Sequence, residues 1–322
     1  MSVAAVSIVI PNWNGRDWLG PCLAALGDQT LAPAEVIVVD NGSHDGSLEY
    51  LRDAHPEVTA IALGANTGFA HAANVGLHRS SGEFVALVNA DVELAPDWLA
   101  RVAGALGRDP GAAAVACKMV SLSDPNRIYD AGDILRRDGV CEQRGRFTRD
   151  DGRFDAPGEV FGACAGAALY RRSALESLGG FDERYFAYLE DVDLALRLRL
   201  AGWRCRYEPA VARHAGEGSA HQLPGGHHLL VARNTIVLVA IWFPPRWLPL
   251  VAYRQLAWLW HAARERRLSS HVRGLAAAVP MLGPAVRARR ARRPPPLVPI
   301  DVAVPARPFR GPRAEGHRRR LG

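Results

Sequence analysis

Three carboxylates crowd the start of the segment Phe186–Trp203. Glu190, Asp191 and Asp193 precede a run in which leucines alternate with two arginines, a pattern typical of an amphipathic helix. Like charges this close repel one another, so a folded protein keeps them where a cation, a proton or a substrate relieves the repulsion. The alternative interpretation is a solvated acidic helix start that complements the helix dipole.

A second candidate group follows the strand predicted at Glu83–Asn89. Residues two apart at a strand end point the same way, so Asn89 and Asp91 can address one ligand. A hard cation such as Mg²⁺ or Mn²⁺ binds through one or two carboxylates together with substrate phosphates. Asp91 is therefore a candidate metal ligand, and the alternative is that it caps the helix beginning near Pro96.

Buried strands alternate with helices in the part of the chain that leads to these groups. We predict strands at Val6–Ile10, Glu35–Asp40, Val58–Leu63 and Glu83–Asn89, with helices at about Trp18–Gly27 and Phe69–Leu77. Strand, loop, helix and strand in this order predict an α/β fold, in which a parallel sheet is covered on both faces. Ligands of such sheets bind at the carboxyl ends of the strands.

Polar residues gather at these carboxyl ends. The candidate substrate-binding residues are Pro11, Asn12 and Asn14 after the first strand, Asp40, Asn41 and Ser43 after the second, and Asn66, Gly68 and Asn74 after the third. Asp40 is placed to accept a hydrogen bond from a nucleobase or a ribose, unless DNGSHDGS is an ordinary polar turn. Asn74 and the amides of the helix start after Gly68 are placed to face a diphosphate, although the G-x-G-x-x-G fingerprint is absent.

Two segments farther along the chain complete the site hypothesis. Gly162–Gly166 is rich in small residues, so we expect it to pass close under a substrate, and the alternative is a small-residue strand in the core. Cys117–Val160 is predicted to be a loop-rich insertion that shapes the acceptor side. Gly166 and Asp193 therefore join the candidate substrate-binding residues.

Five motifs carry a resemblance to a known family. They are SIVIPNWNG, VIVVDNGSHDGS, NTGFAHAANVG, LVNAD and GACAGAALYRRSALESLGGFDERYFAYLEDVDLALRLRLAGWRC. In this order they resemble the inverting family 2 glycosyltransferases of the GT-A fold, and they are most similar to the bacterial rhamnosyltransferase-like members that build surface polysaccharide. The match runs from about Val6 to His214. It implies a nucleotide-diphospho-sugar transferase fold with a mostly parallel central sheet, helices on both faces and, here, a C-terminal helical segment.

The resemblance also implies roles for single residues. Asp40 is expected to contact the nucleotide base, and Asn66 to help hold the donor. Asp91 is expected to bind the divalent metal, Mg²⁺ or Mn²⁺, that bridges the donor diphosphate. Asp191, the second member of the Glu190–Asp191 pair, is expected to be the catalytic base that deprotonates the acceptor hydroxyl.

Two positions modify the expected metal site. His214 lies where some relatives place a further metal ligand, and the alternative is a structural histidine. The family's fuller motif is Asp-x-Asp, but its first position here is Asn89, which is neutral. One carboxylate is therefore lost at the expected metal site.

Glycosyl transfer from a nucleotide sugar requires groups of these types. Negative charge builds on the leaving diphosphate, and a bound cation stabilises that charge. A carboxylate within hydrogen-bond reach of the acceptor hydroxyl takes its proton, which is typically worth roughly 10²–10⁴-fold in rate. One base and direct attack imply a single displacement with inversion, since no residue stands out as a nucleophile beneath the sugar.

The predicted function is therefore that of an inverting glycosyltransferase. It would move a sugar from a nucleotide-sugar donor to a saccharide or lipid-linked acceptor in cell-surface polysaccharide synthesis. Rhamnose from dTDP-rhamnose is the first candidate, on the family resemblance alone. The alternatives are a galactofuranosyl or other hexosyl transferase, and a catalytically weak scaffold protein that binds a nucleotide sugar. A nucleotidyltransferase is disfavoured, because no basic glycine-rich loop lies near the N-terminus and the only lysine is Lys118.

Charge and cysteine content limit the cellular setting. The net charge of +6 comes from the end of the chain, because the residues from Ala285 onward hold 11 Arg against two acidic residues and leave the preceding part at −3. We therefore expect no nucleic-acid partner for the body of the protein. Five cysteines without C-x-x-C spacing predict free thiols in the reducing cytoplasm.

The chain changes character after the predicted catalytic domain, residues 1–220. Residues 221–284 hold four of the eight Trp, and the longest uncharged run between Arg233 and Arg246 has 12 residues, too few to span a bilayer. Apolar stretches that contain Trp and are broken by Arg predict a helical segment bound peripherally to the cytoplasmic face of the inner membrane. The alternative is packing on the catalytic body or in a homodimer. The Pro- and Arg-rich residues 285–322 are expected to be disordered, with their Arg clusters near anionic lipid headgroups.

Overall fold

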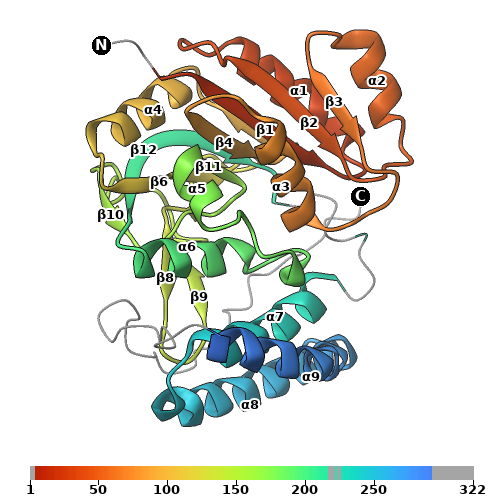
Figure 1. Cartoon of the computed structure of the whole chain (residues 1–322), viewed down its shortest axis with the longest axis vertical. Coiled ribbons are helices and arrows are strands. Elements are labelled where there is room, and N and C mark those ends of the chain that lie inside the picture. Colours follow the sequence, from red (N-terminus) through yellow and green to blue (C-terminus); the bar gives the residue numbers. More distant parts are fainter. Residues whose placement is uncertain (1–3, 217–221, 223–225, 292–322) are drawn as a thin grey trace, which may run out of the picture.

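The computed structural model describes residues 4–216, 222 and 226–291, and Figure 1 shows its elements. The first half of the chain alternates strands and helices: β1 (Val6–Asn12), α1 (Arg16–Gly27), β2 (Glu35–Asp40), α2 (Ser47–Ala54), β3 (Thr59–Ala62), α3 (Phe69–Arg79) and β4 (Phe84–Val88). The four strands are parallel and lie side by side in the order β4, β1, β2, β3. The predicted α/β fold class is confirmed.

The segment of residues 92–214 extends this sheet with strands of both directions. Its elements are β5 (Val92–Leu94), α4 (Trp98–Arg108), β6 (Ala112–Ser121), β7 (Ile128–Asp130), β8 (Asp133–Leu135), β9 (Cys141–Gln143), β10 (Gly158–Val160), β11 (Ala167–Arg171), α5 (Arg172–Ser177), η1 (Glu183–Tyr185), α6 (Glu190–Leu200) and β12 (Arg204–His214). β11 runs antiparallel between β4 and β6, whereas β12 is parallel to β6. The ten-stranded sheet is therefore mixed.

The segment Cys117–Val160 is more regular than the sequence predicted. It begins inside β6, a ten-residue strand, and it contains the four short strands β7 to β10. The first nine residues of β6 are buried, because β11 and β12 pair with its two edges and helices cover it. The prediction of a loop-rich insertion was therefore wrong for its start and only partly right for the remainder.

Helices bury both faces of the sheet, which explains the continuous apolar runs of its central strands. In β1, Ile8 and Ile10 pack in the cluster that holds α1 and α4, whereas Val9 packs in the opposite cluster with α3. Successive residues of a strand point to opposite faces, so a strand covered on both sides has no polar side. The polar residues are left for the strand ends.

The helix predicted in the acidic segment is α6 (Glu190–Leu200), and it has no solvated acidic face. Leu194 packs in the core beneath the sheet, whereas Leu196 packs on the other side against the C-terminal helices. Glu190 and Asp193 are both buried. The alternative of a solvated helix start is therefore wrong, and α6 is a central helix of the molecule.

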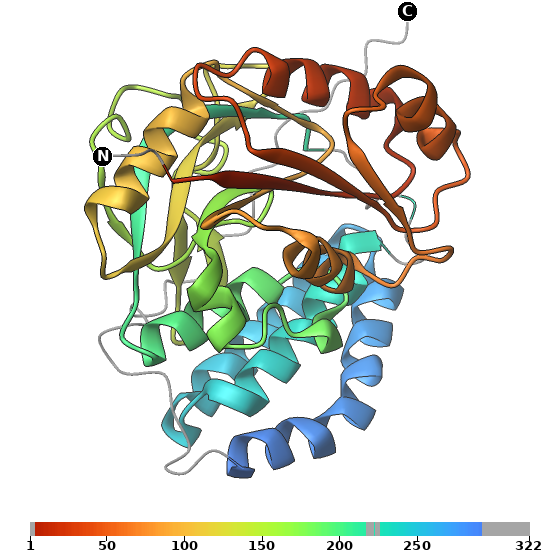
Figure 2. The same cartoon turned by 45° about the horizontal axis from the view of Figure 1, so that its top comes forward.

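In the described part of the chain, three α-helices follow β12, and the first of them packs against α6. They are α7 (Gly226–Trp242), α8 (Leu248–Arg264) and α9 (Leu268–Ala291), with the short 3₁₀ helix η3 (Pro245–Trp247) between the first two. Figures 1 and 2 show α7 next to α6 and α9 along α7, away from the parallel strands. The alternative of packing on the catalytic body therefore holds for α7.

The boundary predicted at Ala285 lies inside α9 and is corrected. Ala285 is buried in the same cluster as Trp242, and the helix continues to Ala291. The remaining residues predicted to be disordered, 292–322, lie outside the described residues, as does the boundary predicted at residue 220.

The structure bears on the predictions about membrane-spanning helices and about the cysteines. Within the described part of the chain, every helix is too short or too polar to cross a membrane. All five cysteines are free thiols, as predicted, and Cys22, Cys117 and Cys205 are buried.

Candidate active site

Asp40 joins the polar loops that follow β1 and β2. Its carboxylate is fully buried and accepts hydrogen bonds from Asn12 Nδ2 and from the Ser43 amide, both at 2.9 Å. The Ser43 hydroxyl accepts a hydrogen bond from the backbone N–H of Asn14 at 2.8 Å. The loops meet because β1 and β2 are adjacent parallel strands that end together, with Asn12 opposite Asp40. Because Asp40 is fully buried, its contact with a base requires the loops around it to move.

Asn41 shapes the turn that contains Asn66 and Gly68. Its Nδ2 donates to Asn66 Oδ1 at 3.1 Å and to the Gly68 carbonyl at 3.2 Å, while its Oδ1 accepts from both the amide and the hydroxyl of Thr67 at 2.8 Å. Asn66 Oδ1 also accepts from the Gly68 amide at 3.0 Å. These bonds use both amide hydrogens and the carbonyl oxygen of Asn41, so the residue predicted to bind substrate acts by holding this turn.

The position of Asn74 corrects a second prediction. Its Nδ2 donates to the Phe181 carbonyl and to Glu183 Oε1, both at 2.9 Å, and its Oδ1 accepts from the Phe181 amide at 2.8 Å. Asn74 is buried and has no group left for a diphosphate. A Cβ at Gly180 would lie 2.4 Å from Asn74 Oδ1, so a glycine is required beside it. Asn74 therefore anchors the loop before η1.

Asp91 and His214 lie together, as the family resemblance implies. His214 Nε2 is 3.4 Å from Asp91 Oδ1, and both side chains are buried. The contact arises from sheet pairing, because the last residue of β12 lies opposite Val92, the first residue of β5. The ring of Tyr129 lies 4.3 Å from the ring of His214, measured between centroids. His214 Nδ1 is buried without a hydrogen-bond partner.

A chain of backbone contacts connects this pair with Asp191. The amide of Asn89 donates to the Gly166 carbonyl at 2.8 Å. The adjacent amide of Ala165 donates to Asp191 Oδ2 at 3.2 Å, and Asp191 Oδ1 accepts from the Val192 amide at 2.8 Å. The end of β4, the loop before β11 and the start of α6 therefore meet at one place.

Tyr188 lies within electrostatic range of both acidic groups. Burial, and after it the charge of Glu190 and more weakly that of Asp91, raises the pKa of Tyr188 to about 12. Together with the backbone contacts of Ala165 and Gly166, this interaction indicates that the start of α6 lies near the end of β4. Sequence analysis missed Tyr188 and Tyr129, although Tyr188 stands two residues before the acidic pair.

The small residues of Gly162–Gly166 are explained by the protein's own packing. A Cβ at Gly162 would lie 2.7 Å from the Cβ of Ala195 in α6. A Cβ at Gly166 would lie 3.3 Å from Asn89 Nδ2, which is a tight contact. The segment is therefore close to the end of β4 and to α6, and Gly166 contributes its carbonyl rather than open space.

The carboxyl groups around Asp191 differ in how easily they ionise. Burial raises the pKa of Asp191, although the amides of Ala165 and Val192 oppose the shift. Burial and the charge of Asp191 raise the pKa of Glu190 well above its usual range, and Glu190 Oε2 is buried without a hydrogen bond. Of this pair, Asp191 therefore loses its proton more easily than Glu190.

Two aspartates that sequence analysis missed lie beside this pair. Burial raises the pKa of Asp130 to about 7 against the opposing hydrogen bond from the Gly132 amide, and the charge of Asp191 adds to the shift. Burial, followed by the charges of Asp130 and Asp191, raises the pKa of Asp133 well above its usual range. The signal was the spacing of two acids in YDAGD within an otherwise apolar stretch.

Asp193 is a structural residue, which corrects its prediction as a substrate ligand. Its Oδ1 accepts from Trp242 Nε1 at 2.6 Å and from the Tyr185 hydroxyl at 3.4 Å. Its Oδ2 accepts from Arg197 Nε at 2.7 Å, and the carboxylate is buried. Asp193 therefore attaches α7 to α6.

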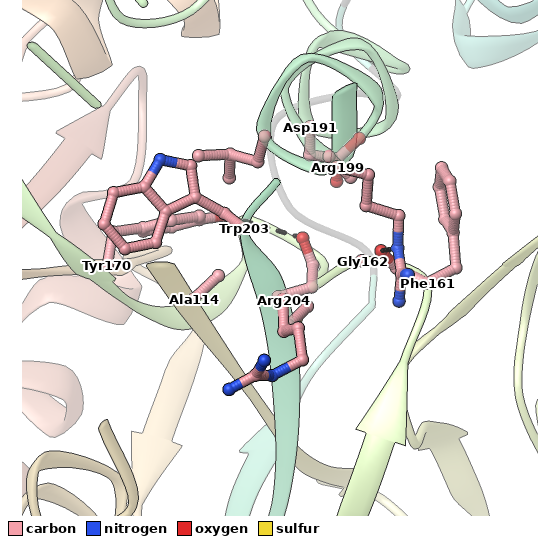
Figure 3. A pocket seen from close by; sticks show the side chains of 12 residues that line it. Ala114, Phe161, Gly162, Tyr170, Asp191, Arg199, Trp203 and Arg204 are labelled. Carbon is pink, nitrogen blue, oxygen red and sulfur yellow. Dashed lines mark hydrogen bonds between the residues drawn. The ribbon is translucent and has the colours of Figure 1, made fainter. Parts of the chain in front are cut away.

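A small pocket lies on the sheet side of α6, and Figure 3 shows its lining. Asp191 borders it at the helix start, while Arg199 donates to the Phe161 carbonyl at 2.8 Å along its rim. Most of the remaining lining is apolar, from Ala114, Tyr170, Ala195 and Leu198. The pocket is therefore a packing gap behind Asp191 rather than a polar sugar site.

The family follows from a comparison with known proteins. The family model described as "Glycosyl transferase family 2" matches residues 7–179, more than half of the chain. The chain belongs to glycosyl transferase family 2. The predicted family is confirmed, and the protein is an enzyme of the glycosyltransferase class.

This glycosyltransferase is similar to a rhamnosyltransferase of known name. It is 31% identical over 243 residues to the N-acetylglucosaminyl-diphospho-decaprenol L-rhamnosyltransferase of Mycobacterium tuberculosis (strain ATCC 25618 / H37Rv), a match that covers 68% of this chain and 78% of the relative. It is 32% identical over 209 residues to the pre-mycofactocin glycosyltransferase of the same strain, which covers 63% of this chain and 41% of that protein.

Solved structures share the fold of this glycosyltransferase. GalNAc-T7 with UDP, GalNAc and Mn²⁺ has a TM-score of 0.62 at 16% identity, over 76% of this chain and 49% of that chain. The mannosyltransferase PcManGT from Pyrobaculum calidifontis in complex with GDP-Man and Mn²⁺ has a TM-score of 0.52 at 22% identity, over 91% and 82%. The GT-A fold is thus confirmed.

Two side-chain atoms of this glycosyltransferase are suitable ligands for a divalent cation such as the Mn²⁺ of these two structures. Asp91 Oδ1 and His214 Nε2, 3.4 Å apart, are close enough to bind one cation at about 2.1 Å each. Among the described residues, no third His, Cys, Asp or Glu side chain joins them to complete a metal site. The other ligands would have to be donor phosphates, water or Asn89, which is the pattern expected when a cation binds with its nucleotide.

Proposed function

We propose that this glycosyltransferase moves rhamnose from dTDP-rhamnose to a lipid-linked saccharide acceptor, with inversion at the anomeric carbon. The observation that carries the proposal is the meeting of Asp191 with the end of β4 through Ala165, Gly166 and Asn89. The similarity to the mycobacterial rhamnosyltransferase supports rhamnose and a lipid-linked acceptor over the galactofuranosyl and other hexosyl alternatives.

In this proposal Asp191 is the general base. The acceptor oxygen forms a bond to the anomeric carbon while the bond from that carbon to the diphosphate oxygen breaks, and the hydroxyl proton passes to Asp191. Asp191 is ionised in preference to the buried Glu190 beside it. Asp91 and His214 are the residues that would hold a divalent cation, which when bound offsets the negative charge of the departing diphosphate.

The experiment combines donor binding with turnover. Nucleotide sugars are screened by thermal shift with Mn²⁺ or Mg²⁺, and we expect dTDP-rhamnose to raise the melting temperature most, because a ligand that binds only the folded form stabilises it. Release of dTDP is then measured with an N-acetylglucosaminyl-diphospho-polyprenol acceptor. Asp191→Asn should lower the rate by roughly 10²–10⁴-fold while the thermal shift persists.

The outcomes separate the alternatives. A larger shift with another nucleotide sugar would replace rhamnose by that sugar. Donor binding without turnover by the wild-type protein would favour the scaffold alternative, to which Asn89 lends support by removing one carboxylate. Normal turnover by Asp191→Asn would show that another group is the base.

The exposed face of α8 supports a peripheral membrane attachment. This face presents large apolar side chains at helical spacing, namely Leu250, Tyr253, Leu256 and Trp260. Leu256 is 67% exposed and Trp260 is 56% exposed, although both are costly to leave in water. The opposite face of α8 is fixed to the body by Arg254, whose Nη2 lies 2.6 Å from Asp138 Oδ2.

The net charge of the C-terminal helices fits an anionic lipid surface. Residues 226–291 contain ten Arg and a single acidic residue, Glu265. Each Arg near an anionic membrane contributes on the order of 1 kcal/mol, and apolar side chains add burial at the headgroup boundary. Binding in this orientation would bring a lipid-linked acceptor to the protein from the membrane.

Vesicle sedimentation tests this attachment. We expect the protein to sediment with phosphatidylglycerol vesicles and to remain in solution with phosphatidylcholine, and a Leu256→Asp, Trp260→Asp double variant to lose most of the binding. Phe147→Ala is the matched control, because Phe147 is 59% exposed but lies outside the C-terminal helices. A concentration-dependent dimer that disappears in the double variant, without vesicle binding, would instead assign this face to a homodimer.

A further inference from the structure

The loop before α6 holds a backbone conformation that its residues do not favour. Phe186, Tyr188 and Leu189 have φ angles of 65°, 69° and 66°. Residues other than glycine are rare in this left-handed region, and such a backbone conformation persists only where the surroundings enforce it. Leu189 directly precedes Glu190 and Asp191, so this conformation determines where α6 begins.

Two residues of α7 enforce this conformation. Asn234 is fully buried, and its Nδ2 lies within hydrogen-bond distance of the carbonyls of Tyr185 and Ala187 at 2.9 Å and of Tyr188 at 2.7 Å. Arg233 Nη2 donates to the same Tyr185 carbonyl at 2.5 Å, and Arg233 Nε donates to Asn234 Oδ1 at 2.8 Å. The carbonyls of Tyr185, Ala187 and Tyr188 thus turn toward α7 rather than toward water.

The other side of the loop is held by α3. The amide of Ala70, in the first turn of α3, donates to the Phe186 carbonyl at 3.0 Å. A Cβ at Gly68 would lie 2.6 Å from that carbonyl, so the loop and the turn at Gly68 are in direct contact. The loop therefore connects the donor side of the site with the C-terminal helices.

We propose that Asn234, assisted by Arg233, is a positioning residue that sets the depth and direction of the Asp191 carboxylate by holding the loop Phe186–Leu189. The proposal rests on the assignment of Asp191 as the base. It goes beyond the family resemblance, which ends near His214, because it makes α7 a part of the catalytic arrangement. Loss of the hydrogen bonds from Asn234 to the loop would let the loop relax and would give water access to Asp191.

The consequence is measurable because the surroundings of Asp191 are acidic and apolar. The titratable groups that surround it are Glu190 in α6, Asp130 and Asp133 from β7 and β8, Cys141 from β9, Cys164 from the loop before β11, and Tyr170 from β11. Burial raises the pKa of Asp191. Greater access of water would return that pKa toward its ordinary value.

The test compares Asn234→Ala with Thr235→Val. Thr235 is equally buried in α7, but its hydroxyl donates within its own helix, to the Val231 carbonyl, so its substitution leaves the loop contacts intact. For Asn234→Ala we expect kcat to fall between about 10-fold and 100-fold with an unchanged KM for the donor. The acid limb of the kcat profile should move to lower pH. Thr235→Val should match the wild type in all three respects.

Hydrogen exchange gives a readout that does not need activity. The amides of residues 186–193 should exchange faster in Asn234→Ala than in the wild type or in Thr235→Val. Unchanged loop exchange, or a fall in the amount of active enzyme without a shift of the acid limb, would overturn the proposal. If Asn234→Ala does not fold, Arg233→Met is measured instead for kcat, for the acid limb and for loop exchange. We expect smaller changes in the same directions, and the absence of these changes would also overturn the proposal.

Failure of the proposed function would be recognised separately. If Asp191→Asn turns over normally, the base is misassigned, whatever the variants of Asn234 do. If Asp191→Asn is inactive while Asn234→Ala keeps the wild-type kcat, acid limb and loop exchange, the base is right and the positioning role is wrong.

Discussion

At the start of α6, three carboxyl groups within four residues have three different surroundings. Asp191 accepts hydrogen bonds from two backbone amides, and Glu190 has an oxygen without any partner. Asp193 is bound by Trp242 and Arg197. These contacts favour an ionised Asp191, a protonated Glu190 and a structural Asp193, so one side chain in this acidic cluster is suited to take a proton.

Glu190→Gln should leave most of the activity. A glutamine has the shape of the protonated carboxyl, and burial and the charge of Asp191 favour the protonated form of Glu190. We expect kcat within about threefold of the wild type, against the roughly 10²–10⁴-fold loss expected for Asp191→Asn. The measurement is dTDP release under single-turnover conditions. Equal inactivity of the two variants would mean that Glu190 takes part in the proton transfer.

The buried Asp130 makes stability depend on pH. Its pKa is raised to about 7, so the folded protein favours the protonated form of this carboxyl. The resulting stabilisation of the folded state is fully present below the unfolded-state pKa near 4 and is lost as the pH rises through 7. The wild type should therefore lose stability between about pH 4 and 7, by at most about 1.4 kcal/mol per pH unit from this group. Asp130→Asn should reduce this slope in urea unfolding measured at several pH values. An unchanged slope would show that Asp130 is ionised in the folded protein.

At the scale of single elements, α6 is held from both sides. Leu194 and Leu198 pack in the core under the sheet, whereas Val192 and Leu196 pack with α7. The hydrogen bond from Trp242 Nε1 to Asp193 adds a polar contact inside this second, apolar interface. A helix enclosed in this way keeps its first turn, and with it Asp191, in a defined place.

Trp242→Phe tests the polar contact between α6 and α7. The substitution keeps an aromatic ring but removes the donor at 2.6 Å from the buried Asp193 carboxylate. We expect the free energy of unfolding to fall by about 1–3 kcal/mol. Trp260→Phe on the exposed face of α8 is the control and should change it by less than about 0.5 kcal/mol. Equal stability of the two variants in chemical denaturation would contradict the role given to this bond.

At the scale of the whole molecule, the C-terminal helices are part of the folded body rather than an appendage. The cluster that contains α7 also includes Leu135, Phe161 and Tyr185 from the catalytic part. Arg289 of α9 donates to the Phe243 carbonyl at 2.9 Å. The helices thus support the site on one side and present the apolar face of α8 on the other.

Two truncated proteins test how far this body extends. One ends after Ala291 and the other after Pro284, so that only the second lacks Ala285 and Arg289. Because Ala285 is buried and Arg289 caps a carbonyl at the end of α7, we expect the shorter protein to be less stable by about 1–3 kcal/mol. Thermal unfolding of the two proteins measures the difference, and equal melting temperatures would show that the core ends before residue 285.

The sequence alone determined the elements whose signals are local. The four parallel strands and the helices between them follow from short apolar runs that end in polar residues, and the predicted strand at Glu35–Asp40 matches β2 in both ends. The motifs also placed Asp191 at a helix start and Asp91 after a strand. These signals depend on neighbouring residues, so they can be read without the fold.

Only the tertiary structure decided which polar groups are available for chemistry. Asn74 is hydrogen-bonded to Phe181 and Glu183, more than 100 residues away. Asp193 is hydrogen-bonded to Trp242, 49 residues away. Whether a carboxyl is ionised depends on burial and on charges brought close by folding, which no local pattern contains. For the same reason, the packing of α7 on α6, which places Asn234 behind the loop before Asp191, could not be inferred from the sequence.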